Sequence, residues 1–294
     1  ALRTPGRAPT AAYVEALRRE IALLAPIVQG LPVSSIHVGG GTPTILLAAE
    51  IDALLGDLVA AFRPGSGFAI GLEAHPASTT PDRVDALARR GVARLSFGVE
   101  TMTRDVLRAV DRADQTTAGV ARAVALTRAA GIEVNVDLLA GLPGETAASW
   151  ADSVRQALAL DPDSMSVNRF IAENSPRAER GWLPDEEQRR LTDAMVLDAD
   201  RVIREVRPPW FPAEPMREAG YGMQYVWERS GRGRGRGYFQ QDMIGPASTL
   251  ALGCGGMGHI HGGSYFTVAG APEAYTAALA GGRPPPMLAA PTTG

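Results

Sequence analysis

A turn of three glycines in this sequence has the composition of a ligand-binding loop. Gly39, Gly40 and Gly41 end a short apolar strand, and Thr42 and Pro43 follow as the expected start of a helix. Glycines leave the backbone N–H and C=O groups open to direct contact with a small ligand. A bare turn that leads into a helix N-terminus suits a carboxylate, an amine or a phosphate. The turn is therefore a candidate binding site.

Three carboxylates, Glu73, Glu100 and Asp137, stand at or near the ends of three further predicted strands. Acids that meet on one enclosed rim repel each other unless a cation or several hydroxyl donors lie between them. A ligand with an ammonium or sulfonium group and a ribose would supply both. Each acid also has a structural alternative: Glu73 could pair with an arginine, Glu100 could be solvated and Asp137 could cap a turn.

The elements that must position these groups alternate between helix and strand. Apolar periodicity predicts strands over 35–38, 68–72, 92–99, 132–139 and 165–170, and helices over 10–29, 45–62, 81–90, 117–130, 146–160 and 184–206. This alternation predicts an α/β fold with a parallel sheet, and leaves open whether the sheet closes as a barrel. In either case ligands gather beyond the carboxyl ends of the strands.

After residue 206 the helical pattern gives way to proline, glycine and aromatic residues. We expect a first domain over 1–206 and a smaller mixed β region over 207–294 that covers the substrate. The basic run 231–237 is expected to be a solvated loop, with RNA binding as its alternative.

Composition narrows the function classes. The 294 residues carry a net charge of −3, so a broad basic field for nucleic acid or an anionic membrane is not expected. No apolar run approaches the ~20 residues that span a bilayer, and the first residues lack the apolar core of a secretory signal. Cys254 is the single cysteine, which excludes an internal disulfide and fits a cytoplasmic protein.

Four motifs occur in order at plausible intervals: Gly39–Pro43, Leu72–Pro76, Gly91–Glu100 and Asp137–Gly144. Together they resemble the radical SAM superfamily, and within it the branch of oxygen-independent coproporphyrinogen III oxidase-like proteins. The resemblance implies a partial (β/α)6 barrel of TIM-like type that binds S-adenosylmethionine (SAM) at its upper rim.

The resemblance also implies roles for single residues at the methionine end of SAM. The turn Gly40, Gly41 and Thr42 would contact the amino group, and Glu73 would help to hold the same end. Arg112 would pair with the SAM carboxylate, for which a guanidinium fork is a natural partner.

At the ribose end, the resemblance implies that Glu100 and Asp137 would hold the hydroxyl groups. The branch more often has glutamine at the position of Glu100, and a carboxylate still accepts two hydroxyl protons. His75 likewise stands where the branch usually has asparagine.

One departure from the family is large. Its 4Fe–4S cluster needs three cysteines in a CxxxCxxC loop just upstream of the first helix, and this sequence has only Cys254. Either the cluster ligands lie upstream of residue 1, which the intact SAM-binding set favours, or reductive SAM cleavage has been lost. His259, His261 and Cys254 could bind a metal, but no spacing supports a fourth ligand; no metal ligand is assigned in this chain.

The function that the resemblance implies is a class C-type methyltransferase, or a related enzyme that forms carbon–carbon bonds on an aromatic or unsaturated natural-product intermediate. Such enzymes act through a 5′-deoxyadenosyl radical, are thought to use two SAM molecules, and need an electron donor such as flavodoxin or ferredoxin. Cys254 would be a candidate hydrogen donor in catalysis.

Two alternatives within the branch stay open. Oxidative decarboxylation of coproporphyrinogen III is disfavoured because no arginine cluster for the propionates stands out beyond the run 231–237. A haem chaperone is disfavoured because residues 238–242 lack the HNxxYW-like motif of those proteins.

Overall fold

The structure is a computed structural model. It describes residues 8–62, 64–170, 185–206, 210–212, 225–229, 248–260, 264–268, 271–285 and 287–291. The chain divides into two compact units, of which the first comprises residues 1–73, 81–93 and 234–294 and the second comprises residues 74–80 and 94–233. The basic run 231–237, residues 238–242 and His261 lie outside the described residues.

The first unit begins with alternating helices and strands. These are α1 (Ala8–Leu24), β1 (Val33–Val38), the short 3-10 helix η1 (Pro43–Ile45), α2 (Ala48–Ala61), β2 (Pro64–Ala74) and α3 (Pro81–Arg89). Strands β1 and β2 are parallel, and their register pairs Val38 with Leu72. Gly39, which follows β1, and Glu73, one residue before the end of β2, therefore lie at the same edge of this pair of strands.

The second unit holds the longer run of alternating elements. These are η2 (Pro76–Ser78), most of β3 (Val92–Glu100), α4 (Arg104–Ala109), α5 (Thr117–Ala129), β4 (Glu133–Ala140), α6 (Ala147–Ala159), β5 (Ser164–Arg169), α7 (Asp185–Val206), β6 (Trp210–Pro212) and β7 (Tyr225–Arg229). Its strand order is β3-β4-β5-β7-β6. The first three strands are parallel, and β7 and β6 add to them as antiparallel strands.

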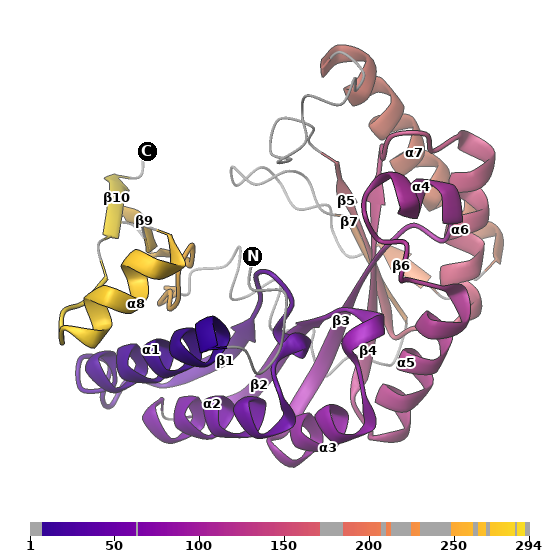
Figure 1. The fold of residues 1–294 in the computed structure, drawn as a ribbon. Coiled ribbons are helices and arrows are strands. Elements are labelled where there is room, and N and C mark those ends of the chain that lie inside the picture. The colour runs from indigo at the N-terminus through magenta and orange to yellow at the C-terminus, as the bar shows by residue number, and fades with distance from the viewer. Residues whose placement is uncertain are drawn as a thin grey trace. The chain divides into compact units, whose positions relative to one another are not determined.

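Strands β3, β4 and β5 carry apolar side chains on one face and polar side chains on the other. Phe97, Val136 and Met165 share one face in register and are fully buried. Helices α5, α6 and α7 pack along these strands (Figure 1). Their buried residues are mostly apolar, so the apolar face of the strands is the one that meets the helices. The opposite face carries polar side chains, among them Ser96 and Asn135.

The C-terminal β region forms part of the first unit. Strands β8 (Met257–His259), β9 (Ser264–Val268) and β10 (Met287–Pro291) make an antiparallel sheet in the order β10-β9-β8. Helix α8 (Pro272–Ala280) packs on α1. Strands β6 and β7 extend the strands of the second unit, and the domain boundary at residue 206 stays a prediction. The substrate-covering role of residues 207–294 stays a prediction.

Most predicted elements are present with shifted ends. The helix predicted over 10–29 ends at Leu24, and the helix predicted over 45–62 is split into η1 and α2. Thr42 precedes η1 as expected, but its side chain makes no capping hydrogen bond. Gly91 and Gly131 have φ of 71° and 74° and follow α3 and α5, which are the helix ends that the sequence predicted.

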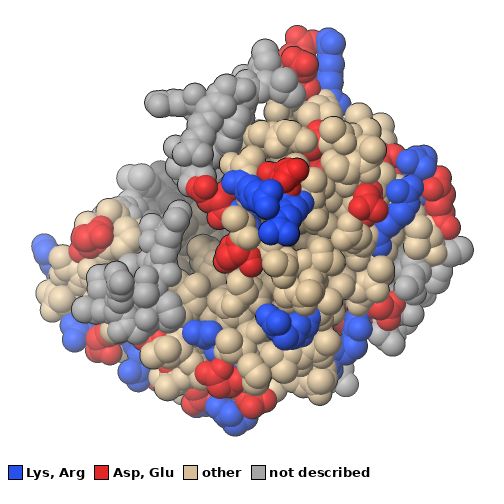
Figure 2. Space-filling view, turned by 45° about the vertical axis from the view of Figure 1, so that its right-hand side comes forward, with Lys and Arg blue, Asp and Glu red and all other residues tan. Residues whose placement is uncertain are grey.

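Two surface properties bear on the predicted partners. On the face shown in Figure 2, basic side chains lie beside acidic ones. Helix α7 carries ion pairs such as Arg201 with Glu205 and Arg204 with Asp200. Of the helices in the described ranges, none has the length and apolarity to cross a membrane. The absence of a nucleic-acid partner stays a prediction.

Candidate functional site

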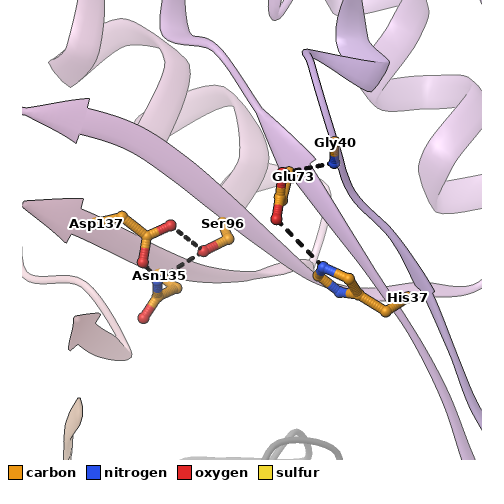
Figure 3. Close-up of polar contacts among 6 residues, drawn as sticks. All are labelled: His37, Gly40, Glu73, Ser96, Asn135 and Asp137. Carbon is orange, nitrogen blue, oxygen red and sulfur yellow. Dashed lines mark hydrogen bonds and ion pairs between the residues drawn. The ribbon is translucent and has the colours of Figure 1, made fainter. Parts of the chain in front are cut away.

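The glycine turn and Glu73 meet in the first unit. The Gly40 N–H donates to Glu73 Oε2 at 3.0 Å, and His37 Nε2 lies 3.4 Å from Glu73 Oε1 (Figure 3). A Cβ at position 39 would lie 2.9 Å from both Glu73 Oε1 and His37 Nε2, so a side chain there would displace the carboxylate. Gly39 is therefore what allows the acid to lie against the turn.

The next positions of the turn are open. Gly40 and Gly41 have φ of 77° and 61°, and a Cβ at either position would meet no atom within 4 Å. Thr42 follows in an extended conformation. The structure thus leaves backbone without side chains beside Glu73, which is the arrangement that a small ammonium ligand needs.

The environment of Glu73 keeps it ionised. Burial acts to raise its pKa, but the hydrogen bond and charge of His37 together with the Gly40 N–H hold the pKa below its ordinary value. His37 was missed from the sequence. The feature that could have indicated His37 is the two-residue period of side chains along a strand. His37 pairs in register with Gly71, and Gly71 is on the same face of β2 as Glu73.

Glu100 and Arg112 form an ion pair in the second unit. Arg112 Nη2 lies 2.7 Å from Glu100 Oε1, and Arg112 Nη1 donates to the Gly98 carbonyl at 2.7 Å. Glu100 has a left-handed φ of 65°, and the β3–β4 register shifts between Gly98 and Glu100. A non-glycine residue in this conformation stores strain, which often marks a functional position.

The loop after α4 sets the position of Arg112. Asp111 has a φ of 57°, and the Arg112 N–H donates to the Leu107 carbonyl at 2.8 Å. Gln115, which is buried, donates to the Val99 carbonyl at 2.7 Å and so fixes the end of β3 against the same loop.

His75 lies within the electrostatic reach of Arg112. Its pKa is lowered, first by burial and then by the Arg112 charge, while Asp114 acts in the opposite direction. His75 is therefore neutral at neutral pH, and its Nδ1 accepts from the Ala77 N–H at 3.1 Å to cap η2.

Asp137 lies inside β4, three residues before the strand ends at Ala140, so it is near the strand end as the sequence predicted. Ser96 Oγ donates to its Oδ2 at 2.6 Å and Asn135 Nδ2 donates to its Oδ1 at 2.7 Å (Figure 3). Its pKa is raised by burial, although Ser96, the Arg94 charge, Ser166 and Asn135 act to lower it.

In the structure, each of the three acids has its own hydrogen-bond or ion-pair partners. Glu73 lies in the first unit, whereas Glu100 and Asp137 lie in the second, on the neighbouring strands β3 and β4. Whether all three meet one ligand stays a prediction. Within the described residues, no group of three or more His, Cys, Asp or Glu side chains could hold a metal ion.

Cys254 is partly buried and packs against a buried cluster of the first unit. The Cys254 N–H donates to the Tyr13 hydroxyl at 3.0 Å, and the preceding Gly253 N–H donates to Glu20 Oε2 at 2.7 Å. The Tyr275 hydroxyl also donates to Glu20 Oε2, at 2.6 Å. Burial and Glu273 raise the pKa of the Cys254 thiol, so it is protonated at neutral pH. Its role as a hydrogen donor stays a prediction.

We expect Tyr275→Phe to lower the free energy of unfolding by about 1–3 kcal/mol, because the buried Glu20 carboxylate loses one donor. Glu20 is 2% exposed and Tyr275 is fully buried. Urea denaturation measures the change. Thr276→Ala on the same helix is the matched control, because the Thr276 hydroxyl bonds only helix carbonyls among the described residues. An equal loss in both variants would show that the contact with Glu20 contributes nothing specific.

The comparison with protein families matches the description "Radical SAM superfamily" to residues 4–157. Among curated proteins, the chain is 38% identical over 182 residues to an oxygen-independent coproporphyrinogen III oxidase of Bradyrhizobium diazoefficiens, and 36% identical over 159 residues to that of Escherichia coli. It is 31% identical over 188 residues to the heme chaperone HemW of Bacillus subtilis.

These matches cover 60%, 54% and 61% of this chain but only 40%, 35% and 49% of the three relatives. Among solved structures, coproporphyrinogen III oxidase (HemN) from Escherichia coli, described as a radical SAM enzyme, superposes with a TM-score of 0.71 at 25% identity. That superposition covers 94% of this chain and 64% of the other. The chain therefore spans well under two thirds of its curated relatives.

Proposed function

This chain belongs to the radical SAM superfamily, and on that premise we propose that it binds SAM for hydrogen abstraction from a small-molecule substrate, as an enzyme of the oxygen-independent coproporphyrinogen III oxidase type. Its fold is the open, largely parallel sheet of a partial TIM-like barrel. The observation that carries the proposal is the ionised Glu73 carboxylate held on the Gly40 N–H, beside a turn without side chains.

The residues present fit SAM by their chemistry. Glu73 and the turn at Gly40 offer a carboxylate and backbone groups to an ammonium. Arg112 makes two contacts within the described residues, and a guanidinium has further N–H donors for a carboxylate. Glu100 and Asp137 offer acceptors to ribose hydroxyl groups. When bound, SAM supplies the sulfonium whose cleavage provides the hydrogen-abstracting chemistry, and the residues of this chain hold and orient it.

The family also implies a 4Fe–4S cluster, and the thiolate ligands for it are not among the residues of this chain. Such a cluster needs several thiolate ligands, and the sequence contains Cys254 alone. We therefore derive no step through a cluster. We also propose that an electron donor such as flavodoxin or ferredoxin acts with this protein, and that the protein is cytoplasmic.

Hydrogen abstraction without methyl transfer is the subtype that the relatives favour. The curated relatives described above are named as oxidases and as a haem chaperone, so the methyltransferase that we first predicted has no support from them. The haem chaperone is the second candidate, because the Bacillus subtilis protein is 31% identical over 61% of this chain. Against it stands the absence of the HNxxYW-like motif from residues 238–242.

The first experiment is equilibrium dialysis of the purified chain against SAM and, separately, against haem. The proposed contacts to SAM all come from residues of this chain, so we expect saturable SAM binding by this chain. Haem bound at one per chain, with no binding of SAM, would contradict the enzyme and support the chaperone.

The second experiment identifies the reaction. The gene-encoded protein is reconstituted anaerobically with iron and sulfide and supplied with a reductant and SAM. We expect 5′-deoxyadenosine without S-adenosylhomocysteine. Equal amounts of the two products would restore the methyltransferase and refute the oxidase type.

A further inference from the structure

Asn135 is a fully buried amide at the centre of the polar face of the second unit. It lies on β4, two residues before Asp137, and is 0% exposed. Its register partners are Ser96 on β3 and Ser164 on β5, so three neighbouring strands place polar side chains around it. Burying an amide in a strand is costly unless all its hydrogen bonds are made.

The hydrogen bonds of Asn135 are complete. Its Nδ2 donates to Asp137 Oδ1 at 2.7 Å and to Ser96 Oγ at 2.7 Å. Its Oδ1 accepts from Ser164 Oγ at 2.7 Å and from Ser166 Oγ at 3.2 Å. Two donors and two acceptor positions are the whole capacity of a side-chain amide.

When Asp137 is ionised, these contacts favour one orientation of the amide. The Asp137 carboxylate has no proton to give when ionised, so it must face the NH2 group and not the oxygen of Asn135. Ser96 gives its own proton to Asp137 Oδ2 at 2.6 Å and so accepts from the same NH2 group. Asn135 and Ser96 therefore hold the two oxygens of Asp137 from two strands and fix the plane of the carboxylate.

We propose that Asn135 is the positioning residue of Asp137: it orients, inside the sheet, the carboxylate that binds the ribose hydroxyl groups of SAM. This rests on the proposed function, because it assumes that Asp137 contacts SAM. Asn135 itself acts through Asp137 and does not touch the ligand.

An apolar residue of similar volume at position 135 would remove the amide but leave its buried polar neighbours without this partner, so a loss of stability is expected as well. The Asn135 amide contributes what an apolar residue cannot, a donor to a charge that burial disfavours. Without that donor, the pKa of Asp137 rises further.

The test compares Asn135→Leu with the parent protein by titration calorimetry with SAM between about pH 5.5 and 8.5. We expect about tenfold weaker binding at neutral pH. We also expect the loss of affinity at low pH to begin at a higher pH, because a less stabilised carboxylate takes up its proton earlier. The charged group that acts on Asp137 is the Arg94 guanidinium on β3, and β5 contributes the neutral Ser166.

Matched variants make the result specific. Gln156→Leu removes another amide that donates to a carboxylate, that of Asp152 at 2.7 Å on the exposed side of α6, and should leave SAM binding unchanged. Ser96→Ala removes a second donor to Asp137 and should shift the pH profile in the same direction. Ser96→Ala replaces Asn135→Leu as the test if Asn135→Leu fails to fold, and urea denaturation would show that failure.

Asp137→Ala separates this inference from the proposed function. If Asp137→Ala loses SAM affinity while Asn135→Leu and Ser96→Ala keep the parental affinity and pH profile, the positioning role is refuted and the SAM site stands. If Asp137→Ala binds SAM as the parent does, the assignment of Asp137 is wrong, and the positioning role fails with it.

Discussion

Trp150→Ala should lower the free energy of unfolding by about 3–5 kcal/mol, the range for removing a large aromatic side chain from a core. Trp150 lies on α6 and is fully buried. Its indole Nε1 donates to the Met195 carbonyl of α7 at 2.7 Å, so the variant loses a hydrogen bond as well as packing. The cavity would open between two helices of the second unit, which pack against each other.

Urea denaturation followed by circular dichroism measures this effect. Trp150→Phe keeps most of the volume and should cost less, because it loses mainly the indole hydrogen bond. Leu197→Ala is the control on α7, because its side chain is 73% exposed and its removal should change stability by less than about 0.5 kcal/mol. Similar losses in Trp150→Ala and Leu197→Ala would show that α6 and α7 do not pack as described.

Arg112→Ala should weaken SAM binding by about 10- to 100-fold. The variant removes the guanidinium proposed for the SAM carboxylate and also the partner of Glu100, which stays as a partly buried charge at the end of β3. Arg112→Lys keeps a positive charge but loses the planar fork, so we expect an intermediate affinity.

Titration calorimetry with SAM measures the affinity of these variants. Arg108→Ala is the matched control: it lies on the neighbouring helix α4 and pairs with Asp105, whose side chain is 87% exposed. Its SAM affinity should equal that of the parent. If Arg112→Ala also binds SAM normally while remaining folded, the role of Arg112 at the ligand carboxylate is wrong.

The sequence predicted the order of the elements well because their ends carry local signals. Pro43 and Pro81 begin helices, and the glycines at 91 and 131 end them in left-handed conformations that glycine adopts at low cost. The motifs on the first strands were likewise visible, because a strand end followed by glycine or a carboxylate is a short-range pattern.

The side-chain partners were less predictable, because they depend on register and on backbone conformations that residue types do not reveal. A left-handed Glu100 is one example, since nothing in its residue type favours a φ of 65°. Asp137 is another, because its partners Ser96 and Asn135 are set by the register of β3 against β4. The network around Asn135 could have been noticed from the two-residue spacing of Asn135 with Asp137 and of Ser164 with Ser166.

The link between Glu20 and Gly253 has a consequence for how this chain folds as it is synthesised. The two residues are 233 positions apart, yet the acid on the first helix is buried only when that late turn and Tyr275 are present. The ribosome adds about 5–20 residues per second, so Gly253 and Tyr275 are synthesised on the order of ten seconds or more after Glu20. Residues 94–233 form one continuous stretch of the second unit and emerge earlier. The second unit is therefore fully synthesised before the first unit, which includes residues 234–294. We expect α1 to be the segment that a chaperone would need to shield during this interval.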